Sequence, residues 1–343
     1  MGNVPNLRFP EFSGEWVTKS INDLAVVIGG GTPDTTVKSY WDGEIQWFTP
    51  SEIGKNKYVD SSLRTITEVG LNNSSAKLLP PNTILLSSRA TIGECSLSLR
   101  ECATNQGFQC LVSKKCNVDF LYYLIQTKKK DLIRKSCGST FLEISANEVR
   151  KIQVSVPSDV EQQKIAELLS LIDERIATQN KIIEDLKKLK SAIRKKVFVS
   201  LKEEHTECCE INQLLTYEQP TAYIVTNDEY STDTTLIPVL TANKGFVLGY
   251  TDEDFGIYQK GECIIFDDFT MDAKYVSFPF KVKSSAIKML TAKPNVNLRF
   301  MFEYLSYLEL KSEEHKRHYI SEIASLVVEL PAEFNLQMQQ NSD

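Results

Sequence analysis

The feature that most constrains this chain is a long stretch, residues 158–204, that contains neither glycine nor proline. Pro157 precedes it, Ser158 is suited to cap a helix there, and Glu161 is placed to complete a capping box with Ser158. The stretch therefore predicts one helix of about 45 residues, roughly 65–70 Å long at ~1.5 Å per residue. A helix of that length is rarely wound inside a single domain, so we interpret it as a spacer between two domains.

Apolar residues recur along this stretch at steps of four and three residues, as in a coiled coil. The apolar positions of this seam are Ile165, Leu169, Ile172, Ile176, Ile183, Leu186, Ile193 and Val197. We expect a partner helix to cover the seam, either from this chain or by self-association with another copy. The lysine and arginine cluster at residues 187–196 has an ordinary interpretation as a solvated face that also complements the helix dipole.

Composition restricts the class of protein. The chain has no run of about 18 apolar residues, so we expect no membrane span. Residues 1–5 lack the pattern of a secretion signal, and we therefore expect a cytoplasmic protein. The eight cysteines include no C-x-x-C pair, so structural zinc is not expected and the thiols are interpreted as reduced and idle.

The net charge of −6 is unevenly distributed along the chain. Residues 1–158 carry a net charge of +3, residues 159–204 carry +1, and residues 205–343 carry −10. An acidic domain repels phosphate unless its basic groups face one way, so the last region by itself argues against binding to nucleic acid. A basic partner subunit would offset that repulsion.

Two blocks on either side of the predicted helix resemble each other. The first has β-rich runs at residues 45–49 and 83–87, a helical pattern from residue 117, and a closing run at 152–157. The second repeats that order at residues 237–241, 263–267, 295 and 326–331. Each block is therefore predicted as several short strands, a helix near its end, and a closing strand that leads to a proline.

The predicted fold class is α+β, with two globular mixed α/β domains joined by one long coiled-coil-type helix. The predicted limits are residues 1–157 for the first domain, 158–204 for the spacer helix, 205–331 for the second domain and 332–343 for a short tail.

Several motifs together resemble a known family. They are GGGTP at residues 29–33, YWDGEIQWFTPSEI at 40–53, RATIG at 89–93, TNQGF at 104–108 and GSTF at 138–141. The start of the predicted helix, VPSDVEQQKIA at 156–166 and LIDERI at 171–176, belongs to the same set. In these runs the chain resembles the DNA specificity subunits of type I restriction–modification systems, which contain two target-recognition domains. The resemblance extends to about Pro331.

The resemblance implies a non-catalytic role. It implies that each recognition domain reads one half of a split double-stranded DNA target, while the helices set the gap between the halves. It also implies docking of modification (methyltransferase) subunits and the addition of a restriction subunit. No cofactor is implied for this chain, and S-adenosylmethionine and ATP are expected in the partner subunits. The family's second long helix is expected after the second domain, and since only residues 332–343 follow Pro331, we expect this chain to lack it.

Reading a DNA sequence requires side chains that present donors and acceptors to base edges. Candidates in the first block lie on predicted loops: Thr32, Lys38, Trp41, Thr49, Ser51, Lys55, Lys57, Arg89, Thr91, Asn105, Gln106, Ser139 and Thr140. Asn and Gln can form two hydrogen bonds with adenine, and Arg89 can do so with guanine. Ordinary interpretations stay open beside these: residues 29–33 as a turn, and Trp41 and Trp47 as core residues.

The second block offers a matching set: Thr241, Asn243, Lys244, Lys274, Tyr275, Lys281, Lys283, Ser284 and Ser285. The basic run His315, Lys316, Arg317 and His318 joins it. We interpret the acidic residues 252–254 as a solvated loop. Asp267, Asp268 and Asp272 lie near Lys274, as in some metal-dependent nucleases, but we favour a structural or partner role. No metal site is expected, since a His-x-x-His pair supplies too few ligands.

Two other classes of protein stay open. A DNA-modifying enzyme would need an Asn/Asp-Pro-Pro-aromatic motif and a glycine-rich cofactor loop, whereas NQGF at residues 105–108 has no proline and GGGTP does not open a helix. The chain also has no P-loop sequence for ATP-driven translocation. A coiled-coil assembly protein is the second rival, and the Asn-, Gln- and Thr-rich loops fit it less well.

Overall fold

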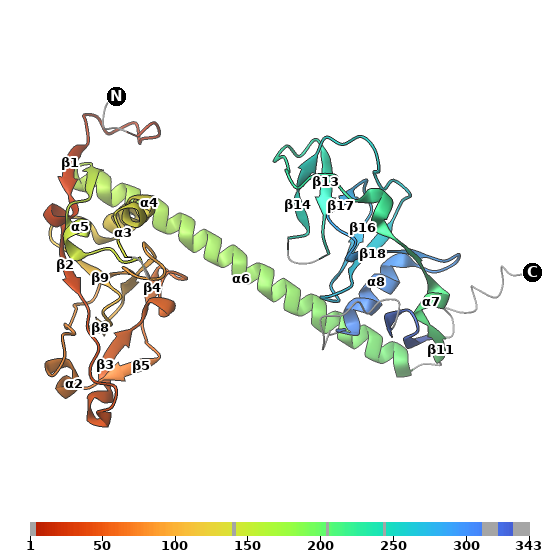
Figure 1. Ribbon diagram of the computed structural model, residues 1–343, viewed down its shortest axis with the longest axis horizontal. Helices are drawn as coiled ribbons and strands as arrows, with labels where there is room; N and C mark the ends of the chain where they lie inside the picture. Colours follow the sequence, from red (N-terminus) through yellow and green to blue (C-terminus); the bar gives the residue numbers. More distant parts are fainter. Residues whose placement is uncertain (1–4, 139–141, 204–205, 243–244, 311–321, 332–343) are drawn as a thin grey trace, which may run out of the picture. The chain divides into compact units, whose positions relative to one another are not determined.

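The computed structural model describes residues 5–138, 142–203, 206–242, 245–310 and 322–331. The chain divides into unit 1, residues 1–180, and unit 2, residues 181–343. Helix α6 (Asp159–Glu203) runs from the first into the second (Figure 1). The predicted long helix is therefore confirmed, with 45 residues. The division falls within α6, so the predicted domain limits stay a prediction. No described helix is long and apolar enough to span a bilayer.

The start of α6 departs from the expected capping box. Ser158 Oγ accepts a hydrogen bond from the Glu161 backbone N–H at 3.4 Å. The Glu161 side chain does not complete the box, because it accepts hydrogen bonds from Arg8 Nε and Nη2, both at 2.7 Å, and from the Trp16 indole at 3.2 Å. Charge-assisted hydrogen bonds to arginine are stronger than a neutral backbone cap. With Glu161 only 1% exposed, this contact ties the N-terminal segment to the helix.

Unit 1 is built from short strands and short helices. Its strands are β1 (Val17–Ser20), β2 (Ala25–Gly29), β3 (Trp41–Phe48), β4 (Tyr58–Val59), β5 (Arg64–Ile66), β6 (Ile84–Leu86), β7 (Cys95–Ser98), β8 (Cys102–Thr104), β9 (Gln109–Ser113) and β10 (Gln153–Val156). Its helices are α1 (Ile21–Leu24), η1 (Lys38–Tyr40), η2 (Pro50–Glu52), α2 (Glu68–Asn72), α3 (Val118–Thr127), α4 (Lys129–Arg134) and α5 (Ala146–Arg150). The strands form sheets in the orders β2-β9-β6-β7-β4, β5-β3-β8 and β1-β10.

Unit 2 uses a similar set of elements. Its strands are β11 (Thr206–Glu210), β12 (Leu215–Glu218), β13 (Ile237–Leu240), β14 (Val247–Thr251), β15 (Cys263–Asp267), β16 (Ala273–Val276), β17 (Lys281–Val282), β18 (Ile287–Ala292) and β19 (Val327–Pro331). Its helices are α7 (Ile211–Leu214), η3 (Pro220–Tyr223) and α8 (Leu298–Tyr307). The sheet orders are β12-β18-β15-β16, β14-β13-β17 and β11-β19.

The sheet orders confirm that the two units share one plan. The order β12-β18-β15-β16 repeats β2-β9-β6-β7, and β11-β19 repeats β1-β10. The order β14-β13-β17 repeats β5-β3-β8, including the parallel pairing of β13 with β17 and of β3 with β8. Strand β4 has no counterpart in the described part of unit 2. The weak internal repeat in the sequence therefore reflects a duplicated topology.

Helices α3 and α8 occupy equivalent places in the two units. Asn117 caps α3 by accepting from the Phe120 N–H at 2.9 Å, and Asn297 caps α8 by accepting from the Phe300 N–H at 3.0 Å. Each helix packs its apolar face into the main core of its unit. Phe198 of α6 joins the core of unit 2, where its ring lies 5.0–5.4 Å from those of Phe300, Tyr304 and Tyr307.

All eight cysteines are free thiols. Burial raises the pKa of Cys95, Cys102, Cys110 and Cys263 to about 12. These thiols therefore stay protonated near neutral pH, where a reactive cysteine would need its thiolate.

Candidate nucleic-acid interface

Four loops that carry predicted base readers meet at one edge of the β5-β3-β8 sheet in unit 1. Because β3 and β8 are parallel, Thr49 and Asn105 follow them at the same edge. The backbone N–H of Asn105 donates to Phe48 O at 3.1 Å, and that of Gly31 donates to Thr104 O at 2.8 Å. The Ser88 N–H donates to Gly107 O at 2.8 Å. Loops 29–33, 49–53, 87–93 and 104–107 are thereby joined through their backbones.

Two glycines allow this close approach. A Cβ on Gly30 would lie 2.0 Å from Asn105 O, and a Cβ on Gly31 would lie 2.2 Å from Ser75 Oγ. Both distances are far below van der Waals contact, so only glycine fits. The GGGTP run is thus more than a turn, since it lets its loop pack against the loop that carries Asn105 and Gln106.

Some polar side chains at this edge form hydrogen bonds within the protein, and others are more exposed. Thr32 Oγ1 donates to Gln106 Oε1 at 2.5 Å, so these two predicted readers meet. Asn105 Oδ1 accepts from the Gly107 N–H at 2.8 Å and shapes its own loop. Thr49 Oγ1 donates to Glu52 Oε2 at 2.6 Å and lies 3.1 Å from Ser51 Oγ. Ser51 and Gln106 are exposed and are the side chains most available to a ligand.

Arg89 lies on a loop with a strained backbone. Ala90 has a φ of 54°, and Gly93 has a φ of 87°. Arg89 Nη2 forms a half-exposed ion pair with Glu143 Oε2 at 2.9 Å, while its Nε is buried without a hydrogen-bond partner. The guanidinium is therefore held at the surface by Glu143, while its Nε is enclosed by the protein. Thr91, which is exposed, donates to Ser87 Oγ at 3.1 Å.

The two tryptophans of this sheet are core residues, as their ordinary interpretation predicted. Trp41 and Trp47 are buried and meet edge to face at 5.1 Å, so Trp41 does not offer a stacking surface for bases. The guanidinium of Arg64 instead covers Trp41, 3.5 Å from its ring centroid. Arg64 is exposed and was missed by the sequence reasoning, although a basic residue that opens a short strand was the available signal.

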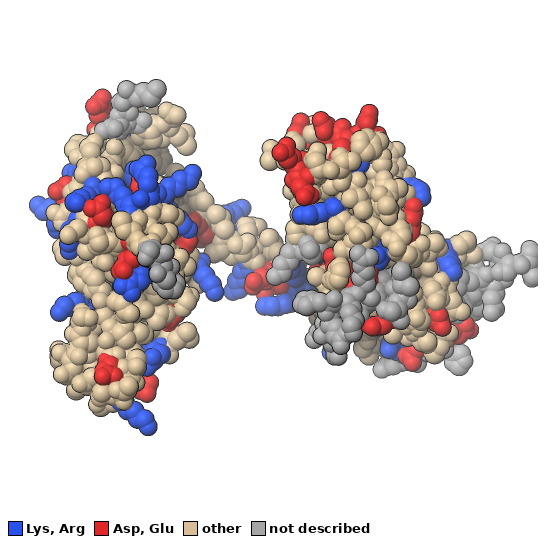
Figure 2. Space-filling model, viewed as in Figure 1, with Lys and Arg blue, Asp and Glu red and all other residues tan. Residues whose placement is uncertain are grey.

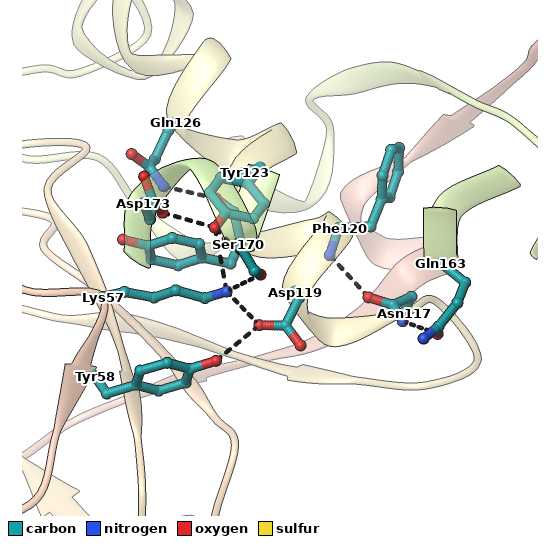
Figure 3. Close-up of polar contacts among 11 residues, drawn as sticks. Lys57, Tyr58, Asn117, Asp119, Phe120, Tyr123, Gln126, Gln163, Ser170 and Asp173 are labelled. Atoms are coloured by element: carbon teal, nitrogen blue, oxygen red, sulfur yellow. Dashed lines mark hydrogen bonds and ion pairs between the residues drawn. The ribbon is translucent and has the colours of Figure 1, made fainter. Parts of the chain in front are cut away.

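The lysines of unit 1 separate into two groups. Lys38 and Lys55 are exposed and stay candidates for DNA contact. Lys57 is not available to DNA, because its amino group turns inward to Asp119, Tyr123 and Ser170 (Figure 3). Its prediction as a DNA-contacting residue is therefore wrong. Ser139 and Thr140 lie outside the described residues.

The equivalent edge of unit 2 carries Lys283, Ser284 and Ser285. The Lys283 N–H donates to Leu240 O at 3.1 Å, the same contact that Asn105 makes with Phe48 in unit 1. Lys283 and Ser285 are exposed and Ser284 is half-buried, so these candidates occupy the position of the Asn105–Gln106 loop. Lys274 and Tyr275 lie elsewhere, on the edge strand β16. Asn243, Lys244, His315, Lys316, Arg317 and His318 lie outside the described residues.

Three predictions for unit 2 are corrected by burial. Lys281 is fully buried and pairs with Glu253 at 2.6 Å, so it is not a DNA contact and residues 252–254 are not simply a solvated loop. A buried charge requires a partner of opposite charge, and Lys281 and Glu253 are partners for each other. Thr241 is also buried, and its N–H donates to Phe246 O at 2.9 Å.

Two of the three acidic residues near Lys274 have structural roles. Asp267 Oδ1 accepts from the backbone N–H groups of Phe269 and Thr270, both at 2.9 Å, and closes the turn after β15. Asp268 forms a buried ion pair with Lys288 at 3.3 Å. Among the residues that the structure describes, no three His, Cys, Asp or Glu side chains come together as a metal site.

Charge is distributed differently over the two units. Figure 2 shows lysine and arginine gathered over the part of unit 1 that contains α3–α5, and aspartate and glutamate gathered over the end of unit 2 that contains β13 and β14. The acidic end of unit 2 does not attract phosphate.

The apolar seam of α6 is largely uncovered. Ile165 and Leu169 are half-buried, and Ile165 packs against the core of unit 1. The other seam residues, Ile172, Ile176, Ile183, Leu186, Ile193 and Val197, are exposed. That row of exposed apolar side chains is typical of a helix that binds another helix.

Comparisons with known proteins agree with the duplicated fold. The family model for the type I restriction modification DNA specificity domain matches residues 13–188, about half of the chain. The chain belongs to this family.

Relatives and solved structures point the same way. The specificity subunit of the type I restriction enzyme MjaIX of Methanocaldococcus jannaschii is 37% identical over 216 residues, which cover 62% of this chain and 50% of that protein. The EcoR124I/EcoR124II specificity subunit of Escherichia coli is 44% identical over 131 residues, covering 36% of this chain and 32% of that protein. This chain thus matches half or less of each relative's length.

The fold also matches that of a solved type I restriction–modification S subunit from M. genitalium. The TM-score is 0.61 at 16% sequence identity, with 98% of this chain and 89% of that chain covered. A chain from a structural study of type I R-M system assembly and conformational transition also matches. Its TM-score is 0.51 at 11% identity, with 98% of this chain and 92% of that chain covered.

Proposed function

We propose that this chain is the DNA sequence-recognition subunit of a type I restriction–modification complex and that it reads a bipartite double-stranded target. The observation that carries the proposal is the duplicated topology, in which two units of one plan each present polar loops at the same edge of an equivalent sheet. A target with two different halves needs two readers whose frameworks match and whose loops differ.

The loop residues differ between the units as such a division of labour requires. Unit 1 presents Ser51, Gln106 and Arg89, whereas unit 2 presents Lys283 and Ser285 at the equivalent edge. Amide and guanidinium groups can form paired hydrogen bonds with adenine and guanine in the major groove. We propose that these side chains contact base edges and that Lys38, Lys55 and Arg64 contact phosphate.

The exposed seam supports a role in assembly. We propose that Ile172, Ile176, Ile183 and Leu186 bind a helix of a modification subunit, and that a restriction subunit joins the resulting complex. The chain itself has no catalytic role in this proposal. S-adenosylmethionine and ATP are bound by the partner subunits, and the complex acts in the cytoplasm.

Binding selection from a library tests the proposal. The full chain, together with its cognate modification subunit, is incubated with duplexes of random sequence, and the bound duplexes are sequenced. We expect two short conserved segments separated by a fixed number of unconserved base pairs. Enrichment of a single continuous motif, or of none, would contradict the proposal.

A block exchange tests the division of labour between the units. Residues 205–331 are replaced by the corresponding block of a relative, and the selection is repeated. One half of the target should change while the other half stays the same. A change in both halves, or in neither, would show that the two units do not read separately.

The rival function is a coiled-coil assembly protein without a DNA role, which the exposed seam also favours. It predicts that the chain binds its partner through α6 but enriches no duplex from the library. The two functions therefore differ in the result of the same selection.

A further inference from the structure

Lys57 lies at the centre of a polar cluster between the globular part of unit 1 and helix α6 (Figure 3). Its Nζ pairs with Asp119 Oδ1 at 2.7 Å and donates to Ser170 Oγ at 2.7 Å and to Tyr123 Oη at 3.2 Å. Tyr123 Oη in turn donates to Asp173 Oδ2 at 2.6 Å. We refer to Lys57, Asp119, Tyr123, Ser170 and Asp173 as the Lys57 cluster.

The surroundings of Lys57 favour the charged form of its amino group. Its side chain is 10% exposed, and the group also lies 4.7 Å from the ring centroid of Tyr123 and 5.1 Å from that of Tyr58. Burial opposes the charge, but hydrogen bonds to Asp119 and Tyr123 outweigh burial and raise the pKa of Lys57. Lys57 therefore does not act as a base toward Ser170, and the cluster is a structural contact rather than a catalytic pair.

Among the polar contacts that the described residues of unit 1 make with α6, those of the cluster lie farthest along the helix. Gln162 and Gln163 hold the first turn of the helix by accepting from the Asn117 backbone N–H at 3.1 Å and from Asn117 Nδ2 at 2.8 Å. Ser170 and Asp173 follow about two to three turns later, ~12 and ~16 Å along the helix from Gln162. Residues 174–193 are all exposed. A rod needs at least two separate points of attachment to have a fixed direction, and the Lys57 cluster supplies one that lies beyond Gln162 and the core contact of Ile165.

Unit 2 attaches to α6 through the equivalent helix position. Tyr123 is the sixth residue of α3, and Glu303 is the sixth residue of α8. Glu303 Oε2 accepts from Arg194 Nη2 of α6 at 2.6 Å, and its Oε1 pairs with Lys190 at 2.8 Å. The same position therefore faces α6 in both units, although the chemistry differs. Lys57 immediately precedes β4, the strand that has no counterpart in the described part of unit 2.

We propose that the Lys57 cluster fixes the direction in which α6 leaves unit 1, and so fixes how many base pairs separate the two halves of the target. This inference rests on the proposed function. Lys57 is a positioning residue that touches no DNA. It places the loop that carries Ser51 and Lys55 in a set orientation to the helix, since Lys57 O also accepts from the Leu97 N–H at 2.7 Å.

The length of α6 makes this contact sensitive. Thirty residues separate Asp173 from the last residue of the helix, Glu203. At ~1.5 Å per residue they span roughly 45 Å. A rotation of about 5° at the cluster would therefore move the far end by roughly 4 Å, more than the ~3.4 Å between successive base pairs. Loss of this attachment point is thus enough to admit neighbouring gap lengths.

The test compares gap lengths in the library selection for the wild type and Lys57→Met, each as the full chain with the modification subunit. Methionine keeps the length and apolar stem of lysine and removes its charge. We expect both half-site sequences to be unchanged. The ratio of the dominant gap to gaps one base pair shorter or longer should fall at least tenfold, which corresponds to ~1.4 kcal/mol in relative binding free energy.

A second variant and a control make the result specific. Tyr123→Phe removes only the hydroxyl group that joins Lys57, Ser170 and Asp173, and it should broaden the gap distribution in the same direction. If Lys57→Met does not fold, the gap distribution of Tyr123→Phe tests the inference instead. Lys151→Met removes an exposed ion pair with Glu148 of α5 at 2.9 Å that includes no residue of the Lys57 cluster, and it should leave the distribution as in the wild type.

Two results would overturn the inference while leaving the proposed function intact. One is an unchanged gap distribution in folded Lys57→Met and Tyr123→Phe. The other is a uniform loss of binding with no change in gap, which would mark Lys57 as a support of the fold alone. If the wild type itself enriches no bipartite motif, the proposed function fails first and this inference fails with it.

Discussion

The buried ion pair of unit 2 predicts that its loss will lower the stability of unit 2 and leave the stability of unit 1 unchanged. Lys281 Nζ lies 2.6 Å from Glu253 Oε2 and donates to Phe255 O at 2.8 Å. The Lys281 side chain is 0% exposed and that of Glu253 is 8% exposed. Lys281→Met leaves the Glu253 carboxylate buried without its partner, which costs about 3–5 kcal/mol in free energy of unfolding.

The same interaction shifts the pKa of Glu253 and so makes the stability of unit 2 depend on pH. Burial opposes ionisation, but hydrogen bonds from Lys281 and Thr226 outweigh burial and lower the pKa of Glu253 to about 2, from an ordinary value of 4.5. That difference corresponds to about 3 kcal/mol of stability. Because the pKa is lowered in the folded state, this stability is present above pH 4.5 and is lost as the pH falls towards 2. The effect of Lys281→Met should therefore shrink as the pH falls from about 4.5 towards 2.

The positions of the tryptophans allow the two units to be followed separately. All three tryptophans, Trp16, Trp41 and Trp47, belong to unit 1. Tryptophan fluorescence during urea unfolding therefore reports unit 1, while far-ultraviolet circular dichroism reports both units. We expect Lys281→Met to shift a circular dichroism transition to lower urea and to leave the fluorescence transition unchanged.

Two further variants control this experiment. Lys260→Met removes the exposed pair of unit 2 with Glu218 and should change little, since solvent screens such pairs. The double variant Lys281→Met with Glu253→Gln removes both charges and should recover much of the lost stability. The reasoning is refuted if Lys281→Met is as stable as the wild type at pH 7, or if the fluorescence transition shifts as far as the circular dichroism transition.

Three more predictions follow from single contacts. Arg89→Ala should weaken binding by ~1–3 kcal/mol at one base pair of one half-site without unfolding the protein, as measured with base-substituted duplexes; an equal loss on all sequences would instead mark a phosphate contact. Phe198→Ala removes a ring that is 5% exposed and should destabilise unit 2 by ~3–5 kcal/mol, with no change in tryptophan fluorescence. Gly30→Ala places a Cβ 2.0 Å from Asn105 O and should abolish DNA binding while the circular dichroism spectrum is kept; normal binding would contradict the role assigned to these loops.

The long helix and the repeat could be predicted from the sequence because both depend on patterns that the chain carries locally. The absence of glycine and proline over residues 158–204 and the steps of four and three define α6 without any long-range contact. The order of β-rich runs defined the duplication although identity between the blocks is low. Both features arise from the period of apolar residues, which the sequence displays directly.

The fate of individual charged side chains could not be predicted in the same way. Lys281 is followed by Val282 and Lys283, yet the first lysine is buried and the second is exposed. What decides between them is Glu253, which lies 28 residues earlier and enters the interior from another strand end. Lys57 likewise meets Ser170 across 113 residues. Such pairings depend on the tertiary structure, so a surface role assigned from residue type alone was wrong for both.

The burial of these lysines also bears on the repulsion between the acidic second unit and phosphate. Residues 205–343 have a net charge of −10. Two of their lysines, Lys281 and Lys288, form buried ion pairs with Glu253 and Asp268. Because each buried pair is neutral, the net charge of −10 is carried by the remaining side chains, which on balance repel phosphate. In the proposed function, a reader with this net charge would supply base contacts but little general affinity for DNA. If unit 2 reads DNA as proposed, we expect basic groups on α6, such as the cluster at residues 187–196, or a basic partner subunit to contribute much of the free energy that holds the phosphate backbone beside it.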